Sequence, residues 1–214
     1  MESCLKVLII SASQKAQSNS FAVARYIQTN IFTQMAKVES SILDLSRYPA
    51  LLDHYGTEQG SNELLAEQKS QVINQLYQCD AVVFVVPEWG GMVPPALVNL
   101  LLLTANGSAG GLPLGHKPAF AIGISASGGG TYPVSLLKGY ASKNSHLTWV
   151  PLHGIVQNVE DFIHYPWQPE QESRFAQVQS RLQVGLKSLT IYAERLKGVR
   201  EELVQLSQLH PFGQ

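Results

Sequence analysis

At 214 residues the chain is long enough for one α/β domain with a substantial core, and its 45% hydrophobic residues exclude a disordered tail. Fifteen basic and 16 acidic side chains give a formal charge of −1, which provides no electrostatic reason to expect nucleic acid or an anionic membrane as a partner. The longest strongly apolar run, residues 96–103, is far too short to span a bilayer. We expect a soluble cytoplasmic protein, because the N-terminus shows no basic segment followed by a cleavable apolar stretch.

The N-terminal part predicts strands and helices in alternation. Strands are expected over residues 7–10, 38–46 and 81–86, and helices from residue 20, over residues 61–78 and from Pro94-Pro95. The runs VLII and AVVFVV are short, continuous and rich in β-branched residues, as is typical of strands covered on both faces of a parallel sheet. Proline suits the first turn of a helix, whose N–H groups lack intrahelical partners.

The C-terminal part continues the alternation. Strands are expected over residues 117–125 and 147–150, and helices over residues 133–143 and from about 170 to 209, with an irregular segment over residues 153–170. This pattern predicts a doubly wound parallel sheet. No linker or repeat interrupts it, so we expect residues 1–214 to form a single domain with a C-terminal helical extension from about residue 170.

The cysteines and histidines form no recognisable metal site. Cys4 and Cys79 have no CxxC or metal-ligand spacing and adjoin predicted strand starts, so we expect two buried free thiols without a disulfide. His153 and His164 flank the irregular segment, but their spacing fits no common zinc arrangement. We therefore expect no bound metal.

The loop after the first strand, SASQKAQSNS at residues 11–20, is the first candidate binding element. Ligands of open parallel sheets bind beyond the carboxyl ends of the strands. Hydroxyl and amide side chains, together with Lys15, precede helix N–H groups that lack partners, which favours an anion site. Helix capping is the alternative, because Ser18, Asn19 and Ser20 are all good N-cap residues. The loop has no glycine and matches neither the Walker nor the Rossmann pattern, which favours a single phosphate over a dinucleotide pyrophosphate.

Two further loops follow predicted strands at the same edge of the sheet. In PEWGGMVPP, residues 87–95, a proline ends the strand ladder, two glycines permit a tight turn, and Trp89 and Met92 offer apolar contact. An ordinary turn with a core tryptophan is the alternative. In SASGGGTYP, residues 125–133, three consecutive glycines indicate either a close approach of the backbone to a ligand or a flexible connection.

Together, the three loops resemble those of the NADPH-dependent FMN reductase family of flavodoxin-like proteins, which includes quinone, azo and chromate reductases. SASQKAQSNS is similar to the family's SGSPRKGSNS-like loop, PEWGGMVPPALVNLLLL to its PEYNGSIPGALKNAIDW, and SASGG to its SASGG. DLSRYPALLD, residues 44–53, also looks like the family's connection after its second strand. The resemblance covers roughly residues 5–150. It implies a flavodoxin-like fold with five parallel strands in the order 2-1-3-4-5 and helices on both faces.

The resemblance also implies a set of cofactor-binding residues. The FMN phosphate would be held by Ser13, Lys15, Ser18, Asn19 and Ser20. The isoalloxazine ring would be lined, mainly through backbone groups, by Pro87, Glu88, Trp89 and Gly90. From the other side the ring would be flanked by Ser127, Gly128 and Gly129.

Four positions depart from the family pattern, and each change could weaken FMN binding. Ala12 replaces a usual glycine, and Trp89 replaces a tyrosine. Lys15 stands where an arginine is usual and acts as a point charge without the planar two-point contact. Gly90 replaces an asparagine and removes one possible side-chain contact to the flavin.

The function implied by the resemblance is that of an FMN-dependent NAD(P)H oxidoreductase. It would pass electrons to a quinone, azo compound, metal oxyanion or free flavin, and the sequence leaves open both this choice and that between NADH and NADPH. No side chain is expected to be catalytic, because the flavin carries the chemistry. The alternatives are a non-enzymic flavodoxin-like electron carrier, which the absence of a strong acidic charge disfavours, and a binding domain that has lost its cofactor.

Two helices predict self-association into a homodimer or tetramer. The helix after Pro95 is apolar almost all round, and such a helix should be buried on every side. A helix that covers a doubly wound sheet keeps one face outside the domain, so a second copy of the chain would have to cover that face. In the closing helix, leucines recur every seventh residue at Leu182, Leu189, Leu196 and Leu203, like a coiled-coil seam that Arg200 interrupts. The alternative for the first half of this helix is that it packs on the sheet.

Overall fold

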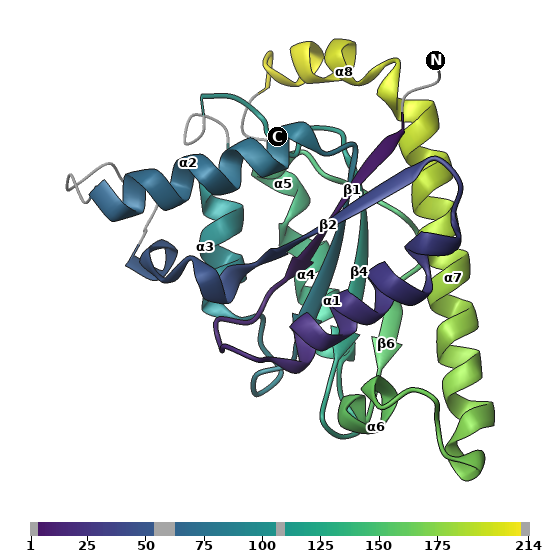
Figure 1. Ribbon diagram of the computed structural model, residues 1–214. Helices are drawn as coiled ribbons and strands as arrows, with labels where there is room; N and C mark the ends of the chain where they lie inside the picture. The colour runs from purple at the N-terminus through teal and green to yellow at the C-terminus, as the bar shows by residue number, and fades with distance from the viewer. Residues whose placement is uncertain (1–3, 54–62, 106–109, 211–214) are drawn as a thin grey trace.

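The computed structural model describes residues 4–53, 63–105 and 110–210 (Figure 1). Its strands are β1 (Leu5–Ser11), β2 (Val38–Asp44), β3 (Ala81–Pro87), β4 (Pro118–Ile124), β5 (Thr148–Trp149) and β6 (Gly154–Val156). Its helices are α1 (Asn19–Asn30), α2 (Glu63–Gln78), α3 (Pro95–Leu103), α4 (Thr131–Tyr140), α5 (Ser142–Ser145), α6 (Val159–Ile163), α7 (Pro169–Lys197) and α8 (Arg200–Ser207). Residues 61 and 62, expected to begin α2, lie outside the described part of the chain. No described helix is both long and apolar enough to cross a membrane.

The sheet is parallel and has the predicted order, β2-β1-β3-β4, followed by β5 and β6. The fifth position is divided between two short strands. β5 pairs with β4 at Pro118–Ala119, and β6 pairs with it at Ile122–Ile124. The strand predicted over residues 147–150 is therefore only part of this position.

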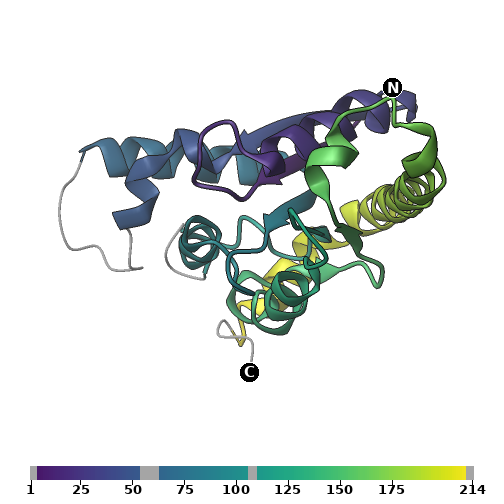
Figure 2. The same cartoon turned by 90° about the horizontal axis from the view of Figure 1, so that it is seen from below.

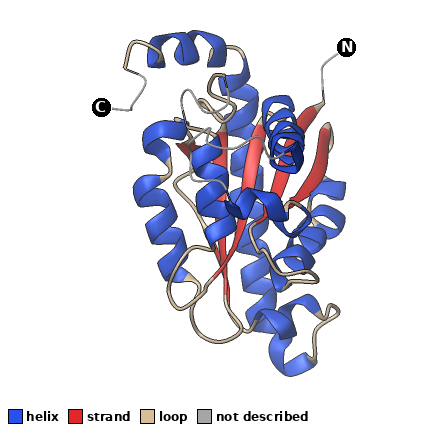
Figure 3. Cartoon of the chain, turned by 90° about the vertical axis from the view of Figure 1, so that its left-hand side faces the viewer, coloured by secondary structure: helices blue, strands red, loops and turns tan. Residues whose placement is uncertain are grey.

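Successive residues of the central strands point to opposite faces of the sheet, and helices cover both faces (Figure 3). Leu8 and Ile10 belong to the cluster that packs under α2, α3 and α4. Val7 and Ile9 belong to the cluster under α1, α6 and α7. Burial of both faces explains why these strands are continuous apolar runs without polar alternation.

The C-terminal helical region differs from the prediction of one continuous helix. The chain breaks at Gly198 and Val199, so that α8 is a separate helix at one end of α7 (Figure 1). Lys197 Nζ lies 3.2 Å and Arg200 Nη1 lies 4.0 Å from carboxylate oxygens of Asp80, just before β3. These contacts attach the junction of the two helices to the amino end of the sheet.

The leucine repeat of α7 packs inside the chain. Leu182, Leu186 and Leu189 are fully buried against the sheet, as the alternative interpretation held. A Cβ added at Gly185 would lie 2.3 Å from the Phe120 ring, so glycine permits the close approach of α7 to β4. These residues are not available for a coiled coil between two copies.

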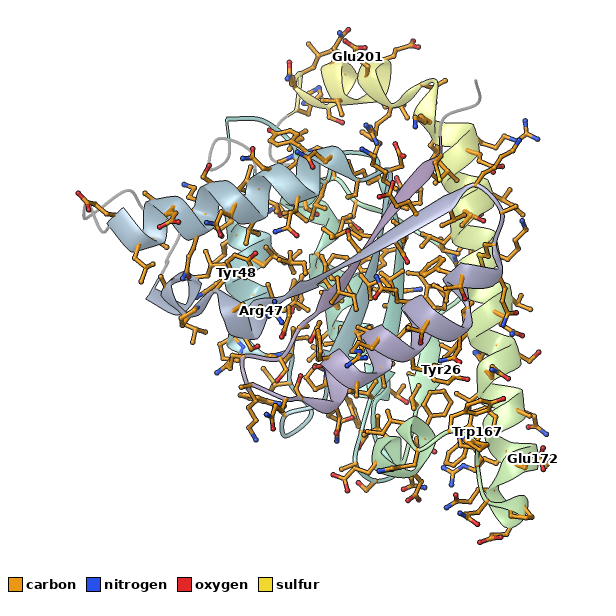
Figure 4. The ribbon with its side chains drawn as sticks, viewed as in Figure 1. Tyr26, Arg47, Tyr48, Trp167, Glu172 and Glu201 are labelled. Atoms are coloured by element: carbon orange, nitrogen blue, oxygen red, sulfur yellow. The ribbon has the colours of Figure 1, made fainter. Side chains whose placement is uncertain are left out.

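The segment predicted to be irregular, residues 153–170, contains β6 and α6 and packs on α1. Tyr26 lies 4.9 Å from Phe162 between ring centroids, and Trp167 packs beside both rings (Figure 4). Burial raises the pKa of Tyr26 to about 12, and its hydroxyl accepts a hydrogen bond from Gln179 of α7. The aromatic contacts fix a segment whose sequence has no clear periodicity.

The two cysteines have different environments. Cys79 is buried, as predicted, but Cys4 is exposed, because it precedes the first buried position of β1. Lys117 was expected to begin β4, but it lies before the strand and is itself buried. Its ammonium group donates to the carbonyl oxygens of Leu76 and Tyr77 at the end of α2, and burial lowers its pKa. We therefore interpret Lys117 as a buried C-terminal cap of α2.

Helix α4 also differs from its predicted range of residues 133–143. It begins earlier, at Thr131, directly after Gly130, whose φ of 102° belongs to the left-handed region. It ends at Tyr140, and the separate short helix α5 follows. The early start places the first turn of α4 beside the glycine-rich loop.

Candidate functional site

The loops after β1, β3 and β4 meet at one edge of the sheet, the edge toward the viewer in Figure 2. They enclose an open pocket of about 360 Å³, within the range of small-molecule sites. Its lining includes eight of the twelve predicted residues: Ser13, Lys15, Ser18, Asn19, Ser20, Pro87, Glu88 and Trp89. The remaining lining residues are Ala16, Gln17, Ile124, Ser125, Ala126 and Val159.

The loop after β1 presents unpaired donors to this pocket. Among the described residues, the backbone N–H groups of residues 16–20 donate to no protein acceptor. Gln17 has a φ of 52°, a left-handed conformation that is unfavourable for a residue with a side chain. Adjacent N–H groups at a helix start and in such a turn can bind an anion together.

Capping and anion binding are compatible in this loop. Ser18 is the N-cap of α1, and its hydroxyl accepts from the N–H of Phe21 at 3.2 Å. The buried Ser20 hydroxyl lies 2.9 Å from Ser18 Oγ and accepts from Ser11 at 3.4 Å. The structure thus confirms the capping role of Ser18, and the N–H groups of residues 16–20 still have no described protein acceptor.

Lys15 places a positive charge across the pocket. Its Nζ lies 5.3 Å from the centroid of the Trp89 ring, a cation–π geometry that joins the first loop to the second. The described salt bridges involve Asp80 and none involves Lys15. The ammonium charge is therefore available to an anionic ligand.

The loop after β3 is a tight hairpin turn. Trp89 and Met92 exchange backbone hydrogen bonds of 3.2 and 3.0 Å around Gly90 and Gly91, whose φ angles are 58° and 81°. Asparagine also tolerates positive φ, so the replacement at Gly90 keeps the turn and removes only a side chain. Gly90 itself is exposed and lies outside the lining, whereas the half-buried Trp89 forms part of the wall.

The loop after β4 is held by the protein, which does not fit the expectation of a flexible connection. Ser127 O accepts from the N–H of Asn158 at 3.1 Å, and Gly128 O accepts from the side chain of Gln157. The N–H of Gly130 donates to the carboxylate of Glu88. Backbone atoms of this loop are paired with residues from two other parts of the chain.

The pocket is lined by the first residues after β4 and not by the predicted Ser127, Gly128 and Gly129. Ser125 and Ala126 follow the strand end directly, and they face the pocket. Ligands of open parallel sheets bind at the carboxyl ends of the strands, which favours these two residues over the glycines further along the loop. Val159 was missed because its segment has no binding motif, and only the packing of α6 on α1 brings it to the pocket.

The chemistry of the pocket suits a phosphate joined to a flat ring. The unpaired N–H groups of residues 16–20 and the Lys15 ammonium supply polar surface, and the Trp89 ring and Ile124 supply apolar surface. The N–H groups of Gly90 and Gly91, in the turn that follows Trp89, also have no described protein acceptor, although neither residue lines the pocket. The donor set therefore fits FMN, with its phosphate at the start of α1.

Comparison with known proteins agrees with this geometry. The family model described as NADPH-dependent FMN reductase matches residues 5–156. No curated protein matches the chain.

Similar solved structures include RosB with bound 8-demethyl-8-formylriboflavin-5′-phosphate, at a TM-score of 0.63 and 12% identity, covering 97% of this chain and 88% of that one. FerB, an NAD(P)H:(acceptor) oxidoreductase from Paracoccus denitrificans, has a TM-score of 0.59 and 16% identity, covering 89% of this chain and 98% of that one. Apo NADH:FMN oxidoreductase EmoB has a TM-score of 0.61 and 12% identity, covering 84% and 89%. At these identities the structures show the shared fold.

Proposed function

The chain belongs to the NADPH-dependent FMN reductase family and is thereby a flavin-dependent oxidoreductase; we propose that it carries electrons from NAD(P)H through bound FMN to a small oxidised acceptor. The observation that carries the proposal is the row of unpaired N–H groups at residues 16–20 facing the pocket. The acceptor class in the proposal is a quinone, azo compound, metal oxyanion or free flavin. Residues 1–214 act as one FMN-binding unit in the cytoplasm.

In this proposal the protein binds and orients the cofactor. FMN supplies the capacity to take up a hydride and release electrons to the acceptor. The start of α1 and Lys15 would hold the phosphate, and Trp89 would contact the ring. The free N–H groups of Gly90 and Gly91 would be available to stabilise negative charge on the bound cofactor, because fixed donors need no reorganisation when charge develops.

A spectrum and two additions test the function. The protein is purified with added FMN, its absorbance spectrum is recorded, and NADH and NADPH are added separately without oxygen. We expect oxidised-flavin bands that bleach with at least one nucleotide. Flavin that neither nucleotide bleaches would favour an electron carrier, and protein that remains colourless with excess FMN would favour a domain that has lost its cofactor.

We further propose that two copies of the chain associate through α3 and α4, which cover the same face of the sheet. Each helix keeps an apolar outer stripe at four-residue spacing, Val98 and Leu102 on α3 and Tyr132, Leu136 and Tyr140 on α4, with exposed fractions from 36% to 70%. Exposed apolar stripes of this kind are typical of interfaces. A second copy is the occupant that fits, because a two-fold axis would pair identical apolar stripes.

Analytical ultracentrifugation at micromolar concentration tests this association. We expect the wild-type protein to sediment as a dimer or a dimer of dimers, and Leu102→Glu with Leu136→Glu to shift it toward monomer. Ile191→Glu is the matched control, because Ile191 is an exposed apolar residue on the outer side of α7. A monomeric wild-type protein would contradict the proposal.

A further inference from the structure

Glu88 projects from the end of β3 toward the glycine-rich loop after β4. Its backbone N–H donates to Ile124 O at 3.0 Å, which extends the β3–β4 pairing one step past Pro87. Its half-buried carboxylate accepts the N–H of Gly130. Glu88 therefore connects the loop after β3 to the end of β4 through its backbone, and to the loop after β4 through its side chain.

The carboxylate also occupies the space beside Gly129. A Cβ added there would lie 2.5 Å from Glu88 Oε2 and 2.9 Å from Cδ. Gly130, the next residue, has a φ of 102°, and its carbonyl is packed so tightly that a Cβ on Gly123 would overlap it. The glycines at 129 and 130 thus permit a close contact with protein, and this contact involves Glu88.

Glu88 has no described cationic partner, since the described salt bridges all involve Asp80. A carboxylate without a lysine or arginine is stabilised by hydrogen bonds from N–H groups, and Gly130 supplies one of them. This bond determines where the chain turns into α4, because Gly130 is the N-cap residue of that helix. The bond also joins the residue before Trp89 to the loop that continues from Ser125, and Trp89 and Ser125 both line the pocket.

We propose that Glu88 is a positioning residue, whose carboxylate holds the glycine-rich loop at the distance from the β3 turn that the flavin ring requires. This inference rests on the proposed function as far as FMN is concerned. The hydrogen bond from the Gly130 N–H to the Glu88 carboxylate, here called the strut, is a property of the protein alone and can be measured without cofactor.

Three replacements of Glu88 separate the effect of side-chain length from the effect of the negative charge. Glu88→Gln keeps an acceptor oxygen at the same reach, Glu88→Asp keeps the charge but is one methylene shorter, and Glu88→Ala removes both. Hydrogen exchange of the flavin-free protein measures the Gly130 amide, and a flavin titration measures the Kd for FMN. In both the Asp and the Ala variant we expect the Gly130 amide to exchange about tenfold faster than in wild type. We also expect the Kd for FMN to rise about tenfold in both, which corresponds to the loss of about one hydrogen bond. The Gln variant should stay within about threefold of wild type in both measurements.

A double-mutant cycle gives an independent test. Gly129→Ala should weaken FMN binding about tenfold, because its Cβ meets the carboxylate, whereas Glu88→Ala with Gly129→Ala should be no worse than either single variant. Multiplying effects in the double variant would overturn the inference. So would an Asp or Ala variant with wild-type exchange, or one with altered exchange and wild-type FMN affinity. If wild-type protein does not bind FMN, the proposed function and the positioning role both fail, and the exchange rates still decide whether the strut exists.

Discussion

The loops after β1 and β4 face the same pocket but differ in the state of their backbone groups. The loop after β1 leaves the N–H groups of residues 16–20 without described protein acceptors. In the loop after β4, Ser127 and Gly128 accept hydrogen bonds, and Gly130 donates one. Unpaired donors are suited to a ligand, whereas paired groups give a loop a fixed shape.

The glycine content of the two loops, taken alone, suggests the opposite assignment. The loop after β4 has three consecutive glycines, which favour mobility or close ligand contact, and the loop after β1 has none. In the folded chain the glycines accommodate Glu88 and the chain turn at Gly130. Glycine content alone therefore does not distinguish a loop that binds a ligand from one that packs against protein.

Charge reversal in the first loop should give the largest effect on binding. We expect Lys15→Glu to weaken FMN binding about 100-fold, because a hydrogen bond or ion pair to a charged group contributes about 1.5–3 kcal/mol and repulsion adds to its loss. Riboflavin, which lacks the phosphate, should lose much less affinity in the same titration. Lys187→Glu on the exposed side of α7 is the control, and equal losses for FMN and riboflavin would contradict a phosphate at Lys15.

A side chain added beneath the loop after β4 should act mainly on stability. We expect Gly123→Ala to lower the free energy of unfolding by about 3 kcal/mol, because the added Cβ would overlap the carbonyl of Gly130 in a close-packed region. Gly139→Ala is the matched control, since a Cβ there meets no atom within 4 Å and alanine is the better helix former. Denaturant unfolding that finds the two variants equally stable would show that the loop after β4 is free to move.

Ser18 separates capping from anion binding. Ser18→Ala should lower the free energy of unfolding by about 1 kcal/mol, because the acceptor for Phe21 N–H is lost. Ser18→Asp should retain the cap and the stability, but it should weaken FMN binding about tenfold by placing a carboxylate near the phosphate. Thermal unfolding and flavin titration measure the two effects, and undiminished FMN affinity in the Asp variant would place the phosphate elsewhere.

The smallest expected effect concerns the left-handed residue of the first loop. Gln17→Gly should raise the free energy of unfolding by about 0.5 kcal/mol, because relief of the unfavourable φ slightly exceeds the entropy that glycine adds to the unfolded chain. Denaturant titration of the flavin-free protein measures the change. A decrease of similar size would show that Gln17 is not held in this conformation in solution.

Much of the fold follows from the sequence because its central strands are buried on both faces. The runs at Val7–Ile10 and Ala81–Val86 have no polar interruption, and their positions and order were predicted correctly. The fifth strand position could not be predicted, because β5 and β6 are too short to show a pattern and pair with β4 at two separate places. The break at Gly198 was not predicted, because the leucine heptad continues past it to Leu203 and only Arg200 interrupts the seam.

The sequence by itself determined the strands, their order through the family resemblance, and the loops that meet at one edge, because these depend on local apolar patterns and motif residues. Only the tertiary structure decided what the side chains of those loops contact. Glu88 reaches Gly130 across 42 positions, Val159 reaches the pocket through the packing of α6, and the α7 leucines face the sheet. Such contacts join segments that are distant along the chain, and the direction of a side chain depends on neighbours that only folding brings together.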